Sequence, residues 1–115
     1  MDFLFLERVF FTDLKLSYKR LALYQELLAK GKKTAAIFMT SEAVSLASIK
    51  LDPQFNTLQQ QYLELASQYG FELLVCGRAF KDRGYDNSDL VAGFTLSGNM
   101  EMLALALRAS HVLEL

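Results

Sequence analysis

The sequence predicts an α/β protein, a single three-layer α/β/α sandwich with a mostly parallel sheet of about five strands. Short, continuously apolar segments alternate along the chain with longer segments whose apolar residues recur at helical spacing. Continuous apolar strands between helices are typical of a parallel sheet covered on both faces. Because no Gly/Ser-rich linker, low-complexity tract or internal repeat interrupts the alternation, residues 1–115 are predicted to form one domain.

The first strand and the first helix are predicted within the first 31 residues. Residues 3–11 are rich in phenylalanine, leucine and valine, which favours a buried strand. Thr12 or Asp13 can cap the following helix, because their side-chain oxygens accept hydrogen bonds from free backbone N–H groups. This helix continues to about Lys30, and Gly31 ends it. Its apolar stripe consists of Leu14, Tyr18, Leu21 and Leu28.

The middle of the chain predicts a short strand, a short helix and a long helix. The strand covers residues 34–40, and the short helix covers 42–49 and ends before the turn at Asp52-Pro53. Thr57, with Gln60 three residues later, has the form of a capping box, so the long helix is predicted to start there and to end at Gly70. Its apolar face consists of Leu58, Tyr62, Leu65, Ala66 and Tyr69.

The last third of the chain predicts three further strands. The third strand covers 71–76 and is followed by a helical turn that begins at Gly77 or Arg78. The remaining elements are a strand over 91–96, a turn over 97–99, a nearly all-apolar helix over 100–109 and a final strand over 112–115.

The composition excludes several kinds of protein. The net charge of −1 argues against a dedicated nucleic-acid binder, which is normally basic. No apolar run approaches the ~20 residues that a membrane span needs. Asp2, Glu7 and Arg8 interrupt the first apolar segment, which lacks the features of a signal peptide. One cysteine cannot form an internal disulfide. We therefore expect a cytoplasmic protein that binds neither a membrane nor nucleic acid directly.

Hydrophobic residues make up 52% of the chain, which is high for so small a domain. We interpret the excess as a subunit interface, and a well-filled core with scattered surface leucines is the alternative.

The most informative residue is Cys76, the only cysteine, which ends the third predicted strand. In open parallel sheets, reactive groups collect beyond the carboxyl ends of the strands. Three cationic residues follow it, Arg78, Lys81 and Arg83, and positive charge stabilises a thiolate, the nucleophilic form of cysteine. Gly77 leaves room for an approaching partner. The alternative is a buried cysteine that acts as a small hydrophobic residue, followed by a solvated basic loop.

Other chemistries have little support in the sequence. One cysteine and one histidine, His111, cannot build a zinc site, so no metal and no cofactor are expected. His111 precedes the last strand, where a packing or surface role is expected. Ser97 and Gly98 do not belong to a G-x-S-x-G motif and are interpreted as a turn and helix cap. A thiol is therefore the chemical group that the sequence offers.

The order of these features resembles the DsrE/TusD family. The resemblance rests on the strand that ends in Cys76, the basic segment up to Gly84, and the run Gly-Phe-Thr-Leu-Ser-Gly that includes Ser97 and Gly98. A helix and a short terminal strand follow, so the match covers Leu4 to Leu115, and the Gly-Phe-Thr-Leu-Ser-Gly run points to the TusD branch.

The resemblance implies a sulfurtransferase subunit that carries sulfur as a persulfide on Cys76. It implies TusB- and TusC-like sister subunits in a hetero-oligomer, a TusA-like sulfur donor and a TusE-like acceptor, in a relay for 2-thiolation of the tRNA wobble uridine. Two alternatives stay open: a DsrE-type subunit of sulfur oxidation, and a non-catalytic assembly or regulatory subunit whose cysteine is merely packed.

Overall fold

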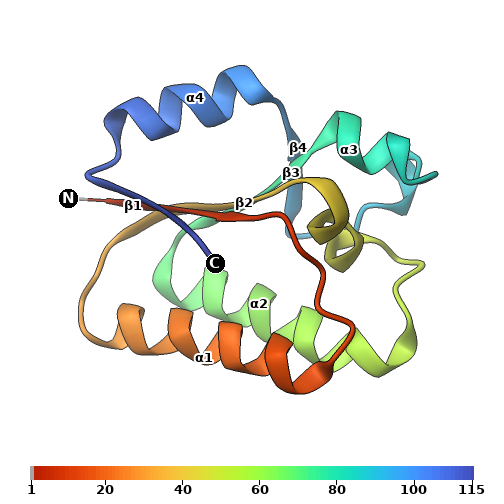
Figure 1. Ribbon diagram of the computed structural model, residues 1–115, viewed down its shortest axis with the longest axis horizontal. Helices are drawn as coiled ribbons and strands as arrows, with labels where there is room; N and C mark the ends of the chain where they lie inside the picture. Colours follow the sequence, from red (N-terminus) through yellow and green to blue (C-terminus); the bar gives the residue numbers. More distant parts are fainter. Residues whose placement is uncertain (1) are drawn as a thin grey trace.

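The computed structural model describes residues 2–115, which form a five-stranded sheet between two layers of helices (Figure 1). The strand order is β4-β3-β2-β1-β5, and every neighbouring pair is parallel. The strands are β1 (Phe3–Glu7), β2 (Thr34–Met39), β3 (Glu72–Cys76), β4 (Phe94–Ser97) and β5 (His111–Glu114). The structure thus confirms the predicted α/β/α sandwich, with a sheet that is parallel throughout.

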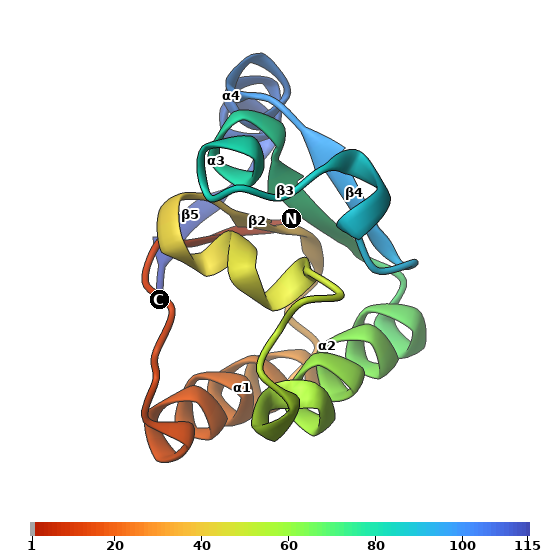
Figure 2. The ribbon, with the colours of Figure 1, turned by 90° about the vertical axis from the view of Figure 1, so that its right-hand side faces the viewer.

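Two helices cover each face of the sheet (Figures 1 and 2). On one side lie α1 (Leu14–Ala29) and α2 (Asn56–Tyr69), and on the other lie α3 (Gly77–Asp82) and α4 (Asn99–Arg108). Three short 3₁₀ helices complete the fold: η1 (Ser41–Ala47), η2 (Pro53–Phe55) and η3 (Asn87–Asp89). Helix α4 connects the two edge strands and therefore crosses the sheet.

Helix α1 begins and ends as its sequence predicts. The Asp13 carboxylate accepts a hydrogen bond from the Lys15 backbone N–H at 2.9 Å, which caps the first turn. Gly31 follows the last turn with φ +81°, a conformation that glycine adopts without steric cost.

The predicted capping box of α2 is wrong. The helix starts at Asn56, one residue before Thr57, and no side chain caps it. The capping residue is Asp52, whose carboxylate accepts from the Gln54 backbone N–H at 3.1 Å and starts η2. Because η2 continues directly into α2, the chain is already helical when it reaches Thr57, which lies inside the first turn.

Three further elements differ from the predictions in type or by more than one residue, whereas the starts of β3, α4 and β5 differ by a single residue. Strand β1 ends at Glu7 because the following backbone bonds to α1: Val9 and Phe11 carbonyls accept from the side chains of Arg20 and Ser17. The segment predicted as a helix over 42–49 is the 3₁₀ helix η1. Strand β4 begins at Phe94, because the Val91 N–H bonds to the Ala47 carbonyl outside the sheet.

The core has a large half and a small half. The large half packs α1 and α2 against the sheet residues Phe5, Ile37 and Leu73. The small half lies under α4 and consists of Leu4, Ala36, Phe38, Leu74 and Cys76. Helix α4 adds partly buried side chains to this half and no fully buried one. Helix α4 therefore contributes less to the core than α1 and α2 do.

A buried polar cluster joins β1 to both helices of the large half. The Glu7 side chain at the end of β1 has no solvent exposure. Its carboxylate accepts hydrogen bonds from the Tyr24 hydroxyl at 2.6 Å and the Tyr62 hydroxyl at 2.9 Å. The Arg20 guanidinium, also buried, lies 3.2 Å from the other carboxylate oxygen. Arg20 in turn donates to the Val9 carbonyl and packs over the Phe11 ring.

Burial raises the pKa of the Glu7 carboxyl, and Arg20 and the two tyrosine hydroxyls oppose that increase. Burial raises the pKa of both tyrosines, Tyr24 and Tyr62, and the charge of Glu7 raises it further. The charges of Glu7 and Arg20 thus depend on each other, because both side chains are buried away from water.

We predict that Arg20→Met lowers the free energy of unfolding by about 3–5 kcal/mol, because it leaves the Glu7 charge buried and unpaired. The double variant Glu7→Gln/Arg20→Met should recover much of that loss. Urea denaturation measures both changes. Arg8→Met is the matched control: it removes an exposed ion pair with Glu114 and should change stability by less than about 1 kcal/mol. Equal effects of the Arg8 and Arg20 variants would contradict the argument.

Candidate functional site

Cys76 lies where the sequence predicts, at the carboxyl end of β3. It pairs in register with Ser97, the last residue of β4, and α3 begins at the next residue, Gly77. The thiol is therefore at the edge of the sheet where all five strands end. Parallel pairing causes this placement, because it brings the ends of adjacent strands to one side.

The Cys76 side chain points toward the layer that contains α4. It belongs to the small half of the core with Phe38 and Leu74, and Ala79 of α3 and Met102 of α4 pack against that group. Only 7% of the residue is exposed. The chain alone therefore covers its thiol almost completely.

The three cationic residues after Cys76 lie on α3 and just beyond it. Arg78, Lys81 and Arg83 are all exposed, and Arg83 lies 3.8 Å from the Glu42 carboxylate. Within residues 2–115, no hydrogen bond or ion pair joins any of them to Cys76. That their positive charges stabilise the Cys76 thiolate stays a prediction. The effect it describes acts over a longer range than direct contact.

A small cavity of about 450 Å³ opens beside α3. It is lined by Ser41, Ala79, Asp82 and Arg83. Ser41 has φ +51°, which is unusual for a residue other than glycine and stores backbone strain. Ala79 lines this cavity and also packs against the small half of the core, which contains Cys76. The cavity and the thiol thus share one wall.

The predicted turn over 97–99 is a direct junction instead: Ser97 ends β4, Gly98 is the N-cap residue of α4, and Asn99 is the first residue of that helix. The junction brings in a residue that the sequence analysis missed. Since Ser97 pairs with Cys76, both side chains point to the same face of the sheet. The Ser97 hydroxyl donates to the Glu101 carboxylate at 2.5 Å. The sequence contained one signal for this contact: Ser97 stands four residues before Glu101 at the predicted start of a helix. The cover over the thiol is therefore attached at its amino end by this hydrogen bond.

The glycines of the site have different roles. A Cβ at Gly77 would lie 3.6 Å from the Ser97 carbonyl oxygen, an ordinary contact, so close packing does not require glycine there. Gly84 has φ +86° and follows the end of α3, where a left-handed conformation favours glycine.

Metal ions need sets of ligand side chains that lie close together. Among the described residues 2–115, no group of three or more His, Cys, Asp or Glu side chains could hold a metal ion. His111 lies on β5, where its ring stacks on Phe3 with centroids 4.7 Å apart.

None of the helices within residues 2–115 has both the length and the apolar character that a membrane span requires.

The fold and the site define a parallel α/β/α sandwich with a single thiol at the carboxyl edge of its sheet. A family model for the DsrE/DsrF-like family matches residues 6–115, and the chain belongs to this family. Family membership supports a role related to sulfur relay and confirms the resemblance at the level of the family.

Two solved structures share the fold over almost the whole chain. The ychN protein from E. coli has a TM-score of 0.78 at 17% identity, and the match covers 100% of this chain and 99% of that one. A protein of unknown function, MTH1491 from Methanobacterium thermoautotrophicum, has a TM-score of 0.69 at 13% identity, with 96% of each chain covered. No curated protein sequence matches the chain.

We predict that iodoacetamide labels Cys76 much more slowly in the native chain than in the unfolded chain, because α4 covers the thiol. Glu101→Gln weakens the hydrogen bond to Ser97 and should raise the native labelling rate about three- to tenfold. Glu64→Gln, an exposed glutamate on α2, is the matched control and should leave the rate unchanged. Native labelling as fast as that of the unfolded chain would mean that the thiol is open to solvent.

Proposed function

We propose that this protein is a sulfurtransferase subunit that accepts and passes on sulfur as a persulfide on Cys76. The observation that carries the proposal is the position of the single thiol, at the carboxyl edge of a parallel sheet in a chain of the DsrE/DsrF-like family.

The transfer step needs no metal or organic cofactor. The Cys76 thiolate attacks the outer sulfur of a persulfide on the donor protein. The donor's sulfur–sulfur bond breaks, its cysteine leaves as a thiolate, and Cys76 now carries the transferred sulfur as a persulfide. In the second transfer, the thiolate of the acceptor protein attacks the outer sulfur of the Cys76 persulfide, and Cys76 leaves as a thiolate. Arg78, Lys81 and Arg83 favour both anionic forms of Cys76 through their charge.

We propose that the relay serves 2-thiolation of the tRNA wobble uridine. In this scheme a TusA-like carrier donates the sulfur, a TusE-like protein accepts it, and TusB- and TusC-like subunits complete a cytoplasmic hetero-oligomer. The support is the TusD-like run from Gly93 to Gly98, which contains β4 and the N-cap residue of α4 and lies beside Cys76. A DsrE-type subunit of sulfur oxidation would use the same thiol with different partners.

One observation favours a second candidate function. With only 7% exposure, Cys76 has the environment of a packed core residue. A non-catalytic assembly or regulatory subunit would keep it so in every state. The persulfide carrier requires instead that partner binding moves α4 enough to admit the donor's sulfur.

The decisive prediction is that Cys76 gains one sulfur atom. The assembled protein, incubated with a cysteine desulfurase, cysteine and the loaded TusA-like carrier, should show this addition in the intact mass of the chain. Dithiothreitol should remove it, and Cys76→Ser should abolish it. Arg83→Ala should slow loading about two- to tenfold, because it removes long-range electrostatic help and leaves the nucleophile in place.

Arg8→Ala is the matched control for Arg83→Ala, because Arg8 is an exposed arginine that follows β1 at the same edge of the sheet. It should load at the wild-type rate. If the wild-type chain gains no sulfur from a demonstrably loaded carrier, the packed-cysteine subunit is the better account.

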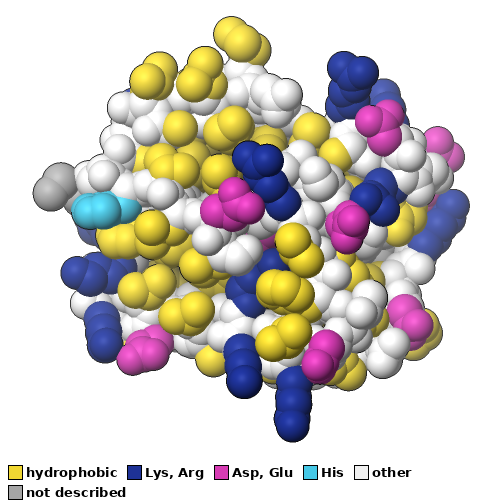
Figure 3. Space-filling view, viewed as in Figure 1, with side chains coloured by type: hydrophobic (Ala, Val, Ile, Leu, Met, Phe, Trp, Pro, Cys, Tyr) yellow, Lys and Arg dark blue, Asp and Glu magenta, His cyan; other side chains and the backbone are white. Residues whose placement is uncertain are grey.

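An apolar surface supports the proposed assembly. The outer side of α4 exposes Met100 (81%), Leu103 (49%) and Leu107 (79%), and the edge strand β5 exposes Val112 and Leu113. Figure 3 shows apolar side chains gathered over α4 and across the face below it. The outer edge of β5 is also unpaired among the described strands. An apolar helix beside an open strand edge is typical of a subunit interface.

We predict that Leu107→Lys prevents assembly with the sister subunits, because it places a charge within this apolar surface. Light scattering on the chain co-expressed with its candidate partners measures the effect. Ile49→Lys is the matched control, since Ile49 is an exposed apolar residue (62%) next to η1 and away from α4. A monodisperse wild-type monomer in the presence of the partners would contradict the interface.

A further inference from the structure

The amino end of the sheet, opposite Cys76, contains a second group of features that the sulfur chemistry does not use. The loop between α1 and β2, residues 30–33, separates two cavities of about 470 and 440 Å³. Lys32 and Lys33 line both of them. Cavities of this size are typical of sites for small ligands.

The loop that carries these lysines is held in place by the backbone. The N–H groups of Lys30, Gly31 and Lys32 donate to the carbonyls of the last turn of α1. The Lys33 carbonyl accepts from the Phe3 N–H at 2.7 Å, which attaches the loop to β1. The backbone positions of the two lysines are therefore fixed before any ligand binds, which lowers the entropy that binding costs.

The amino end has a local surplus of positive charge in a chain whose net charge is −1. The residues that line the two cavities, and a third one beneath α4, include the cations Lys32, Lys33 and Arg108 against the single carboxylate of Asp2. None of these four forms an ion pair within residues 2–115.

Compensation of the α1 dipole does not account for this surplus. The end of α1 favours nearby positive charge, and its last carbonyls already accept backbone hydrogen bonds. Lys30, the lysine nearest to the helix, pairs with Glu26 at 3.1 Å and lines neither cavity on the two sides of the loop. Lys32 and Lys33 lie beyond Lys30, and neither ammonium group forms an ion pair within residues 2–115.

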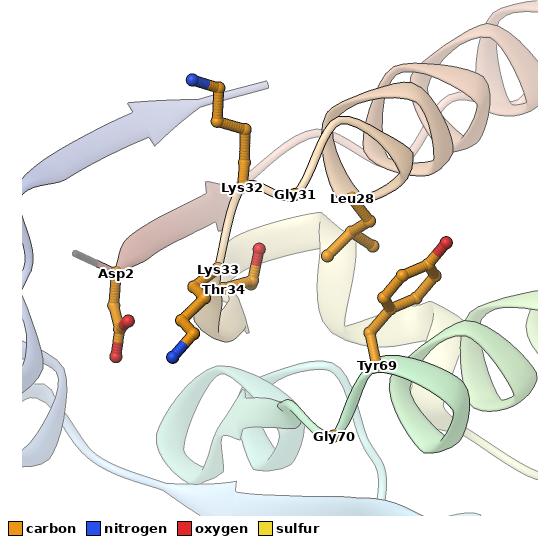
Figure 4. Close-up of a pocket in the computed structure, with 8 residues that line it drawn as sticks. All are labelled: Asp2, Leu28, Gly31, Lys32, Lys33, Thr34, Tyr69 and Gly70. Carbon is orange, nitrogen blue, oxygen red and sulfur yellow. The ribbon is translucent and has the colours of Figure 1, made fainter.

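The larger cavity has an apolar wall opposite its charged one (Figure 4). Leu28 and the ring of Tyr69, which is 40% exposed, lie on one side, and Lys33 and Asp2 lie on the other. The Lys32 side chain leaves the loop in the opposite direction to that of Lys33 (Figure 4). A ligand that fits this arrangement has an anionic group at one end and a flat, apolar group at the other.

We propose that this cavity binds a small phosphorylated ligand with a flat ring, of which a nucleoside monophosphate is the simplest representative. Lys33 contacts the phosphate, Lys32 and Arg108 add long-range attraction, and the ring packs on Tyr69 and Leu28. The site lies at the end of the sheet away from Cys76, so it is independent of the sulfur transfer proposed above.

NMR titration of the ¹⁵N-labelled full chain with AMP tests the proposal. Shifts should concentrate on residues 28–34 and 69–72, with a dissociation constant of about 1 mM or tighter. Adenosine and inorganic phosphate, each carrying half of the recognised chemistry, should bind more weakly. Lys33→Gln should weaken AMP binding about tenfold and Tyr69→Leu about fivefold, while the spectra of the free variants show that the fold is retained.

Lys30→Gln is the matched control, because it removes the same charge from the same loop without touching the cavity, and it should leave AMP affinity within about twofold. Equal weakening by the Lys30 and Lys33 variants would overturn the site in favour of diffuse attraction. Shifts spread over other surfaces, or no shift at millimolar AMP, would also overturn it. Binding of single-stranded RNA but not of AMP would assign the lysines to a polyanion surface instead.

Discussion

The structure depends on the burial of one carboxylate, Glu7, at the end of β1. β1 lies between β2 and β5, and its last side chain points into the large half of the core. An ionised carboxylate without water is costly unless opposite charge and hydrogen bonds satisfy it. Tyr24 of α1, Tyr62 of α2 and Arg20 of α1 supply these partners. The partners of this single residue therefore tie both helices to the end of β1, in addition to the apolar packing between the helices and the sheet.

The same cluster determines the path of the chain after β1. Arg20 donates to the Val9 carbonyl and packs on Phe11, so residues 8–11 follow the surface of α1 and do not extend the strand. The Leu115 carbonyl lies 3.5 Å from the same guanidinium. Arg20, in the large half of the core, thus contacts the residue that follows the edge strand β5. Both faces of β5 itself remain exposed. This edge strand and the apolar α4 are the surface to which we assign the proposed subunit interface.

The two halves of the core divide the properties of the protein. The large half contains the long helices and the buried ion pair, which are suited to a fixed scaffold. The small half contains Cys76 under a helix with no fully buried residue, fastened by the bond between Ser97 and Glu101. Elements with little buried apolar surface open most easily. The thiol therefore lies beneath a helix that buries little apolar surface of its own.

The sequence by itself determined the parallel sandwich, the ends of α1 and the position of Cys76 at the carboxyl edge. Each follows from local information: apolar periodicity, a capping Asp13, Gly31, and a strand that stops at the cysteine. Only the tertiary structure decided that Glu7 and Arg20 are buried, that α4 covers the thiol, and that Lys33 and Tyr69 face one cavity. These facts depend on residues far apart in the chain, such as Glu7 and Tyr62, separated by 55 positions. Local patterns cannot report such pairs, because a charged residue has the same local sequence signal whether its partner is water or a buried side chain.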